Sequence, residues 1–417
     1  MVAVFGRRLA VVALLALPAA AAAQDPRAFP VVGDLLSRQD GGGPPGDGIS
    51  SQPTVSDDGR IVAYRSEAPN LGASEPRPAL LVHDRSTSRT RVLVRAVEDG
   101  DIDDDDLFDP QLSADGRVLA FVGEPDELSP DDSDANEYIG FQFRDVFVAD
   151  VRTGRTELVS RRSAARGGGA ADGPSDAPAI SADGRTVAFV SVADRLVPGT
   201  PREGIFAFVR DRRARRTERL PDRIRGLGGR ATRTTGASVS GDGRVVAYAA
   251  ERSRGGVTDV AIVRHDRRSR RTQVLTRYST ADLDDLDLST SISDDGRRVG
   301  YATQRGSRRR PAADDDDNVN VARVFDARTG RSRTLSTRGG RTIEGREVVL
   351  SPDGRRAAFR SEEGDVNRLW LRRLDRRSAA PVAQGGIDPA FARAGGLAAV
   401  SESDGELTSQ IYLRRLR

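Results

Sequence analysis

The sequence predicts an all-β protein, a single β-propeller with seven four-stranded antiparallel blades, or six if the last unit is only a tail. Three observations support this. A short pattern centred on Asp-Gly recurs six times at intervals of 53 to 68 residues. Apolar segments flank every copy, and no convincing helix is found between copies. A period in this range indicates a repeat architecture.

Each copy reads Ser-x-Asp-Gly followed by an apolar segment that ends on an aromatic residue. The first copy covers residues 55–64, with Asp58-Gly59 in its turn. Asp-Gly between β-branched segments favours a hairpin, because Gly accepts a positive φ and Asp hydrogen-bonds its own turn. The six turn glycines are Gly59, Gly116, Gly184, Gly243, Gly296 and Gly354.

Two further strands follow each hairpin. Residues 146–150 end in Asp and lead through a polar turn to residues 157–159, and residues 324–326 and 334–335 repeat this order. One four-stranded sheet cannot bury both of its faces alone, whereas several sheets packed radially can. We therefore expect four strands per unit in meander order.

The two ends of the chain predict how the ring closes. A degenerate seventh copy covers residues 394–400. Residues 411–413 supply the third strand of this unit, and no fourth strand follows them in the sequence. Residues 35–38 (Leu-Leu-Ser-Arg) match residues 158–161 (Leu-Val-Ser-Arg), and a Gly-rich link follows both. We expect the N-terminal strand to complete the last blade, which removes two free sheet edges.

The segment Ser-x-Asp-Gly-Arg-x-Val-Ala-aromatic, at residues 56–64, resembles the WD-repeat-like repeat of TolB-type bacterial β-propellers. The third-strand phrase at residues 208–211 also fits. The resemblance covers nearly the whole mature chain and implies an extracytoplasmic propeller module. We expect no counterpart of the N-terminal α/β domain of TolB and no hydrolase domain, and no Gly-x-Ser-x-Gly elbow occurs in the sequence.

The first 23 residues predict a cleaved signal peptide, which leaves residues 24–417 as the propeller domain. Arg7 and Arg8 precede an apolar run that ends in three alanines before Gln24. The run is shorter than the roughly 20 residues that span a bilayer, and no later stretch approaches that length, so we expect no membrane insertion after cleavage. The expected location is outside the cytoplasm, either extracellular or periplasmic at the cell envelope.

Composition excludes several kinds of chemistry. The absence of Cys removes disulfides, zinc–thiolate sites and thiol catalysis. The net charge of +3 provides no large field to attract nucleic acid. The two His, His83 and His265, share one repeat slot before an Asp. Because that slot varies between copies, we expect it to be peripheral and non-catalytic. Its other occupants are Ala149, Arg210, Phe325 and Leu374.

The repeats also serve as an internal control for catalysis. A nucleophile or an acid–base carboxylate is needed once, whereas Ser56 and Asp58 have equivalents in six copies. We interpret them as turn elements and expect no catalytic or cofactor-binding residue. The Arg clusters, such as Arg212-Arg213 and Arg267-Arg268, are interpreted as solvated hairpin tips, with polyanion binding as the alternative.

Acidic runs in the long loops are the candidate metal ligands. Calcium binds six to eight oxygens from flexible carboxylate-rich loops. Asp131, Asp132, Asp134 and Asn136 form the first candidate site, followed by Asp315, Asp317 and Asn318. Solvated loop charge without a bound ion is the alternative.

Antiparallel order assigns the loops to two surfaces. The turns between strands one and two and between strands three and four share one surface, which we call the turn face and expect to be basic. The remaining loops share the long-loop face, which we expect to be acidic and to carry recognition. We expect a monomeric, non-enzymatic binding or scaffold protein for an envelope or extracellular protein, a glycan or a cation. The alternatives are a carbohydrate-active enzyme with carboxylates at the channel mouth and a TolB-like envelope-assembly partner.

Overall fold

The computed structural model divides the chain into two compact units, Met1–Pro30 and Val31–Arg417. All of the residues that the structure describes lie in the second unit, so the predicted signal peptide lies outside them. The described residues are 33–73, 78–95, 107–124, 128, 144–280, 287–305, 319–338, 340–363, 366–375, 380–384, 390–391, 397–403 and 409–415.

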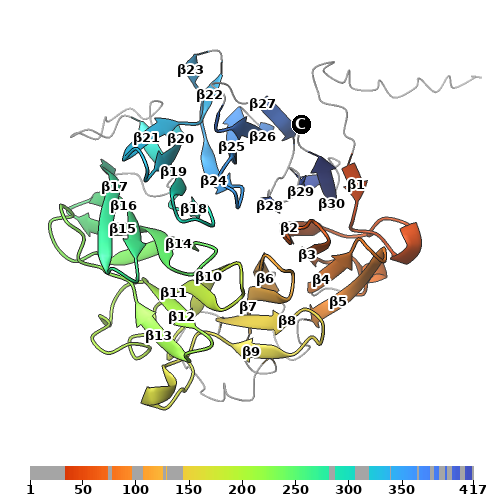
Figure 1. Cartoon of the computed structure of the whole chain (residues 1–417), viewed down its shortest axis with the longest axis horizontal. Coiled ribbons are helices and arrows are strands. Elements are labelled where there is room, and N and C mark those ends of the chain that lie inside the picture. Colours follow the sequence, from red (N-terminus) through yellow and green to blue (C-terminus); the bar gives the residue numbers. More distant parts are fainter. Residues whose placement is uncertain are drawn as a thin grey trace, which may run out of the picture. The chain divides into compact units, whose positions relative to one another are not determined.

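The Val31–Arg417 unit is a single all-β propeller, as predicted. Its described strands form seven four-stranded antiparallel sheets and one separate hairpin. Six sheets contain four consecutive strands each, and the seventh combines both ends of the chain. In Figure 1 the sheets surround a central axis, with the first strand of each blade innermost. Within the described residues, no helix is long and apolar enough to cross a membrane.

The strands follow one another blade by blade. Blade one contains β2 (Ser50–Val55), β3 (Ile61–Ser66), β4 (Ala79–Asp84) and β5 (Arg89–Arg95). Blade two contains β6 (Leu107–Leu112), β7 (Val118–Gly123), β8 (Asp145–Asp150) and β9 (Thr156–Leu158). Blade three contains β10 (Ser175–Ile180), β11 (Thr186–Ser191), β12 (Phe206–Asp211) and β13 (Arg216–Arg219). Blade four contains β14 (Arg233–Val239), β15 (Val245–Arg254), β16 (Val257–Asp266) and β17 (Arg271–Thr280).

Blade five contains β18 (Thr290–Ile292), β19 (Arg298–Arg305), β20 (Val319–Asp326) and β21 (Arg331–Thr334). Blade six contains β24 (Arg346–Leu350), β25 (Arg356–Glu363), β26 (Val366–Arg373) and β27 (Ala380–Gln384). Blade seven contains β28 (Ala390–Phe391), β29 (Leu397–Ser403), β30 (Ser409–Arg415) and β1 (Gly33–Leu35). The separate hairpin pairs β22 (Thr337–Arg338) with β23 (Arg341–Thr342). Three short 3-10 turns complete the described elements: η1 (Asp40–Gly42), η2 (Pro69–Leu71) and η3 (Ala164–Arg166).

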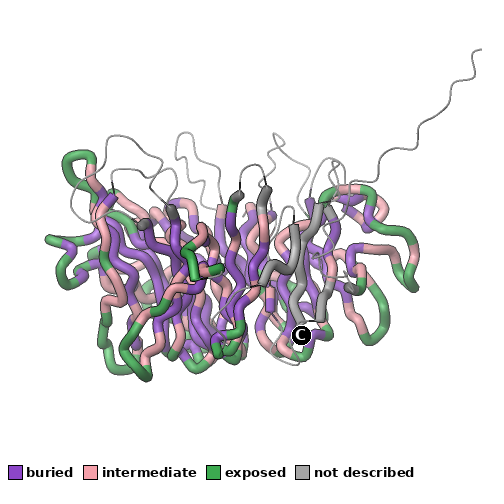
Figure 2. Tube along the Cα trace, turned by 90° about the horizontal axis from the view of Figure 1, so that it is seen from above, coloured by how far each residue is buried: buried purple, intermediate pink, exposed green. Residues whose placement is uncertain are grey.

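The apolar core lies between neighbouring sheets. The aromatic residue of each repeat is fully buried there, as Tyr64, Phe121 and Phe189 show. Phe121 and Phe189 stack on the third-strand rings of Phe147 and Phe208, with centroids 5.8 and 5.7 Å apart. Figure 2 shows the buried strands in purple and the exposed turns in green. The recurring aromatic therefore supplies one packing anchor in each of blades one to six.

The chain closes as the sequence predicts. β1 pairs antiparallel with β30, and Leu35 lies opposite Tyr412. The buried Ser37 donates its hydroxyl to Gln410 at 2.5 Å and accepts a hydrogen bond from the Ile411 amide at 2.9 Å. Ser160 accepts from the Val146 amide at 3.0 Å in the same way in blade two. The matching tetrapeptides thus make matching contacts.

A chain of backbone hydrogen bonds joins consecutive blades at the turn face. The residue after each repeat Ser donates its amide to the corresponding carbonyl of the next blade, as Asp57 does to Ala114 at 2.8 Å. The chain of donors and acceptors continues through Ala182, Gly241 and Asp294 to Pro352. Proline has no amide hydrogen, so the series of donors ends at blade six.

Removing the N-terminal strand should destabilise the ring. We expect a mature protein that lacks residues 24–38 to lose more than about 3 kcal/mol of unfolding free energy, because buried Leu36 and the hydrogen bonds of Ser37 are removed. Urea unfolding followed by fluorescence measures the change. A protein that lacks only residues 24–30 is the control, and equal stability of the two truncated proteins would contradict closure by β1.

Candidate functional site

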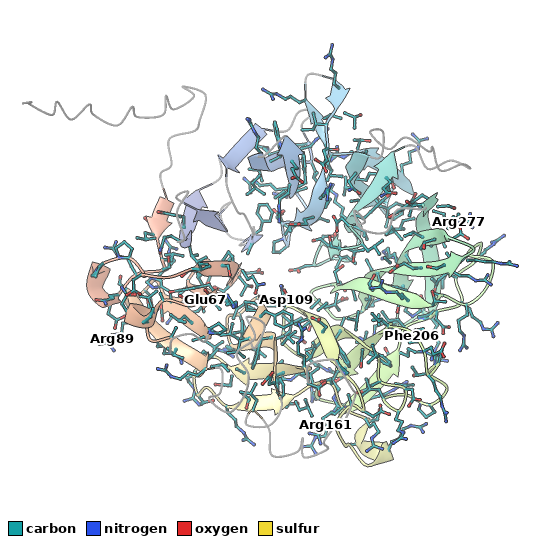
Figure 3. The ribbon with its side chains drawn as sticks, turned by 180° about the vertical axis from the view of Figure 1, so that it is seen from behind. Glu67, Arg89, Asp109, Arg161, Phe206 and Arg277 are labelled. Atoms are coloured by element: carbon teal, nitrogen blue, oxygen red, sulfur yellow. The ribbon has the colours of Figure 1, made fainter. Side chains whose placement is uncertain are left out.

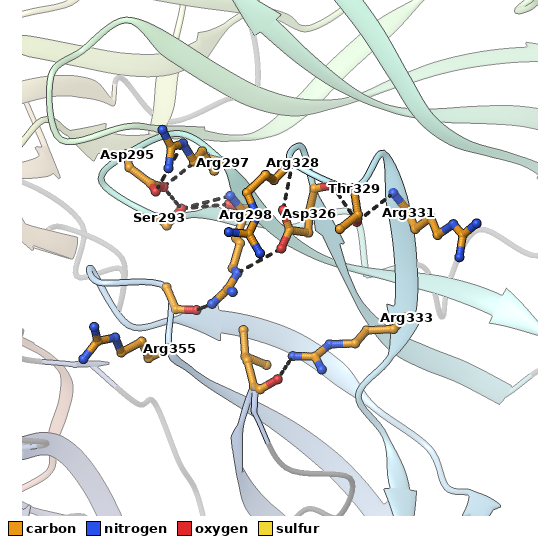
Figure 4. Close-up of polar contacts among 12 residues, drawn as sticks. Ser293, Asp295, Arg297, Arg298, Asp326, Arg328, Thr329, Arg331, Arg333 and Arg355 are labelled. Atoms are coloured by element: carbon orange, nitrogen blue, oxygen red, sulfur yellow. Dashed lines mark hydrogen bonds and ion pairs between the residues drawn. The ribbon is translucent and has the colours of Figure 1, made fainter.

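The repeated Ser and Asp form the hairpin turns. Ser56 donates its hydroxyl to Asp58 at 2.6 Å and accepts from the Ile61 amide at 2.9 Å, while Asp58 accepts from the Arg60 amide at 2.9 Å. All six copies share this network. Figure 4 shows it in blade five, where Ser293 contacts Asp295. The interpretation of these residues as turn elements is confirmed.

The Arg of the repeat ties this turn to the end of the third strand in three blades. Arg60 approaches Asp84 through two parallel contacts, Nε to Oδ1 at 3.1 Å and Nη2 to Oδ2 at 2.7 Å. The equivalent pairs are Arg185–Asp211 and Arg244–Asp266. Hydrogen bonds from the Arg partners hold the pKa of Asp84 and Asp266 well below the usual range.

A second Arg, directly after that Asp, connects its blade to the preceding one. Arg212 donates to the Gly184 carbonyl at 2.7 Å, and its Nη2 lies 2.6 Å from the Glu157 carboxylate on β9. Arg85 and Arg267 make the same contacts with Asp34 and Glu218. The first Arg of each of these hairpins is therefore part of the fold, so the interpretation of the clusters as solvated tips is wrong for that residue.

The repeat slot that contains both His is buried, so the expectation of a peripheral slot was wrong. His83 and His265 expose 6% and 7% of their surface, and each Nδ1 lies 2.9 Å from a Thr hydroxyl, Thr90 or Thr272. The slot varies because it lies against the link from the preceding blade, which differs between blades. Among the described residues, the hydrogen-bond partner of each His is this Thr hydroxyl.

Arg occupies this slot in two blades. Arg210 donates to the Arg162 carbonyl at 3.1 Å and to the Thr217 hydroxyl at 3.0 Å, and burial together with Arg161 lowers its pKa to about 10. In blade six the register places Arg372, not Leu374, in the slot. The assignment of Leu374 was wrong because two additional residues precede Asp375.

The buried His predict a pH-dependent stability. Burial lowers the pKa of both His83 and His265. The unfolded chain, with His pKa about 6.5, therefore binds more protons than the folded chain just below that pH. The stabilisation by the two neutral His should be fully present above about pH 6.5, and the unfolding free energy should fall as the pH decreases below that value.

Urea unfolding at fixed ionic strength between about pH 4.5 and 7.5 measures this dependence. The double variant His83→Gln, His265→Gln should show a weaker change in this window. It should retain the loss below about pH 4, where Asp84 and Asp266 take up protons in the unfolded chain while the Arg partners keep them ionised in the folded protein. An unchanged profile in the double variant would rule out the two His as its cause.

The first strands of all seven blades line an axial channel of about 420 Å³. Small and apolar side chains line most of it, with Asp57 and Asp294 at the turn face and Glu347 towards the other end. Sequence reasoning missed a bulge on five of these strands, where one residue has a φ between 49° and 58°. These residues are Gln52, Asp109, Ala177, Gly236 and Glu347. Figure 3 shows Asp109 close to the axis.

A pocket of about 520 Å³ opens at the long-loop face, where strands of blades two, three and four meet. Val190, Val192 and Ile205 provide an apolar floor. Arg144 precedes β8 in blade two and Arg233 begins β14 in blade four, so the two guanidinium groups come from either side of blade three. An apolar floor with a few polar groups at the rim is typical of small-ligand sites. We call this set the interblade pocket.

Polar contacts orient the rim of the interblade pocket. The Arg144 guanidinium lies 5.2 Å from the centroid of the Phe108 ring. Arg233 lies 4.0 Å from the buried Glu251 carboxylate, which also accepts from the Thr235 hydroxyl at 3.1 Å. Asp176 accepts from the Ala177 amide at 2.6 Å. No sequence pattern predicted this site, because its residues come from three repeats.

The predicted calcium ligands lie outside the described residues. This applies to Asp131, Asp132, Asp134 and Asn136 and to the second candidate, Asp315, Asp317 and Asn318. Within the described ranges, no group of three or more His, Asp or Glu is placed to hold a metal ion. Calcium binding by these loops remains a prediction, as does the acidic character of the long-loop face.

No protein-family model matches the sequence, and no curated protein matches it in sequence. Solved structures are similar in fold. The β-propeller domain of the Trilobed protease from Pyrococcus furiosus has a TM-score of 0.54 at 11% identity, covering 88% of this chain and 95% of that one. The structure of oligogalacturonate lyase in complex with manganese has a TM-score of 0.54 at 11% identity, and the match covers 93% of this chain and 97% of the lyase chain.

TolB from Acinetobacter baumannii is also among the similar structures, with a TM-score of 0.46 at 18% identity over 81% of this chain and 67% of that one. The acylaminoacyl peptidase of Pyrococcus horikoshii has a TM-score of 0.54 at 14% identity, and this chain spans about half (52%) of the length of the peptidase. At these identities the comparisons show a propeller fold alone, because one fold serves many activities.

Proposed function

We propose that this protein is an exported, non-enzymatic binding or scaffold protein that recognises its partner through the long-loop face. The interblade pocket is the observation that supports this most directly. It combines an apolar floor with two Arg and lies on the surface formed by the variable loops. A rigid propeller presents such a site with little cost of conformational ordering.

The lining of the interblade pocket favours binding over catalysis. Its described lining contains one carboxylate, Asp176, and no His. Glycoside hydrolysis uses two carboxyl groups about 5 to 9 Å apart. The repeated Ser and Asp, which are the most frequent candidate nucleophiles, are held in the turns on the opposite face.

The two Arg define the chemistry of the partner. Guanidinium groups bind carboxylates through paired hydrogen bonds, and the floor accepts an aliphatic group. The group that fits is a carboxylate next to an apolar body, as on a peptide segment of an envelope protein or on an acidic glycan. We expect such a partner outside the cytoplasm, and the signal peptide predicted from residues 1–23 and the TolB-type resemblance support this expectation.

Pocket variants test this proposal. Peptide and glycan arrays identify a ligand of the mature protein, and calorimetry gives its Kd. We expect Val192→Trp, which fills the pocket, and the pair Arg144→Gln, Arg233→Gln to weaken binding by about tenfold or more, since each removes a contact that a carboxylate-bearing ligand requires.

The matched control is Arg89→Gln, Arg91→Gln, which removes two exposed Arg from β5 on the outside of blade one. Figure 3 shows Arg89 far from the axis. Equal affinity of the pocket variants and the wild-type protein would exclude the interblade pocket. Turnover of an arrayed glycan would favour the carbohydrate-active alternative instead.

A further inference from the structure

The outer rim of the propeller carries two hollows that the proposed function does not use. They lie on either side of the hairpin between β12 and β13 in blade three. The first, of about 1240 Å³, borders β9, and the second, of about 500 Å³, borders blade four. Both include residues of the link that follows β9, Ala164 in the first and Ser163 with Arg166 in the second. We call the two hollows together the basic rim.

Arg predominates in both linings. Each hollow contains five Arg and two acids. The first contains Arg155, Arg161, Arg210, Arg212 and Arg215 with Asp150 and Glu157. The second contains Arg166, Arg216, Arg219, Arg267 and Arg270 with Glu218 and Asp222. The positive charge therefore exceeds the negative charge in each hollow.

The fold neutralises only part of this charge. Arg212 and Arg267 pair with Glu157 and Glu218, and Arg219 lies 3.6 Å from Asp222. Arg166, Arg215 and Arg270 are exposed, and their side chains form no ion pair or hydrogen bond within the described part of the chain. These three guanidinium groups remain available to a ligand.

The turn geometry does not require Arg at these positions. Ser88, Arg215 and Arg270 occupy the same place in the hairpins of blades one, three and four, with φ values of 53°, 50° and 55°. Ser88 thus makes the turn without a charge. A long side chain on a residue with a left-handed backbone conformation does not stabilise the hairpin. The Arg of blades three and four therefore have a role at the protein surface and not in the turn.

We propose that the basic rim binds an extended anionic polysaccharide. A chain of sulfate or carboxylate groups that crosses the blade-three hairpin places anions in both hollows. Each anion can then accept the paired hydrogen bonds that guanidinium offers. This site is separate from the interblade pocket and does not depend on the function proposed for it.

The linings favour a polysaccharide over the other polyanions. Neither described lining contains Phe, Tyr or Trp, which single-stranded nucleic acids use for base stacking. Arg219 covers the ring of Phe206 at 5.7 Å, and this Phe is only 1% exposed. Insertion into an anionic membrane needs exposed apolar groups. The one large apolar side chain exposed among the described residues is Ile49, outside both hollows.

Binding to heparin and to alginate tests the proposal and separates sulfate from carboxylate recognition. The mature wild-type protein should bind at least one of them, with an affinity that falls as salt increases. The triple variant Arg166→Asn, Arg215→Asn, Arg270→Asn should bind about tenfold or more weakly, because it removes three anion contacts. Asn tolerates the left-handed conformation at positions 215 and 270, so the hairpins are preserved.

The control variant Arg328→Asn, Arg331→Asn removes two exposed Arg from the hairpin of blade five and should bind like the wild-type protein. Protection of Arg166, Arg215 and Arg270 from phenylglyoxal by the polysaccharide, read by mass spectrometry on the wild-type protein, provides a second measurement that needs no variant. Three results would overturn the proposal: wild-type affinity in the triple variant, an equal loss in the control, or tighter binding to single-stranded DNA or anionic vesicles.

Discussion

The antiparallel pairing of β1 with β30 is the constraint on which the remaining structure depends. Each blade buries apolar side chains against both neighbours, so an open series of blades would expose two apolar faces and two strand edges. After closure, Leu36 and Ile411 from opposite ends of the chain share one core cluster with Val55 and Tyr64. The buried hydrogen bonds of Ser37 fix the register at this junction. The channel exists because all seven first strands are held around one axis.

The repeated residues and the unrepeated residues have separate tasks. Ser56 and Asp58 represent the network that holds the hairpin turn in six blades, and Arg60 with Asp84 represents the pair that ties this turn to the third strand in three blades. A residue that recurs in this way gives no blade an individual chemistry. Recognition is therefore left to positions where blades differ, namely the links, the pocket rims and the outer hairpin tips.

The blades could be predicted from the sequence because local patterns define them. These patterns are the Asp-Gly turns, the alternating strands and the tetrapeptide shared by residues 35–38 and 158–161. Prediction from the sequence failed where contacts between neighbouring blades or the strand register determine which residues are buried. The slot of His83 is buried by the link of another blade, and Leu374 was assigned instead of Arg372 because only the strand register distinguishes them. The bulge at Ala177 has no Gly to mark it. The interblade pocket was not predictable, because three repeats contribute to it.

Charge segregation explains how a chain with a net charge of only +3 can carry a strongly basic surface. The first Arg of a hairpin is bound to the preceding blade, as Arg212 is to Glu157, so its charge is neutralised by the fold. Every further Arg in the turn between the third and fourth strands adds uncompensated positive charge at the rim. The turns of blades three and four each contain more than one such Arg. The interaction range of such a patch is about 8 to 10 Å in physiological salt. The basic rim and the long-loop face can therefore bind different ligands without mutual interference, since the blade-three sheet separates them.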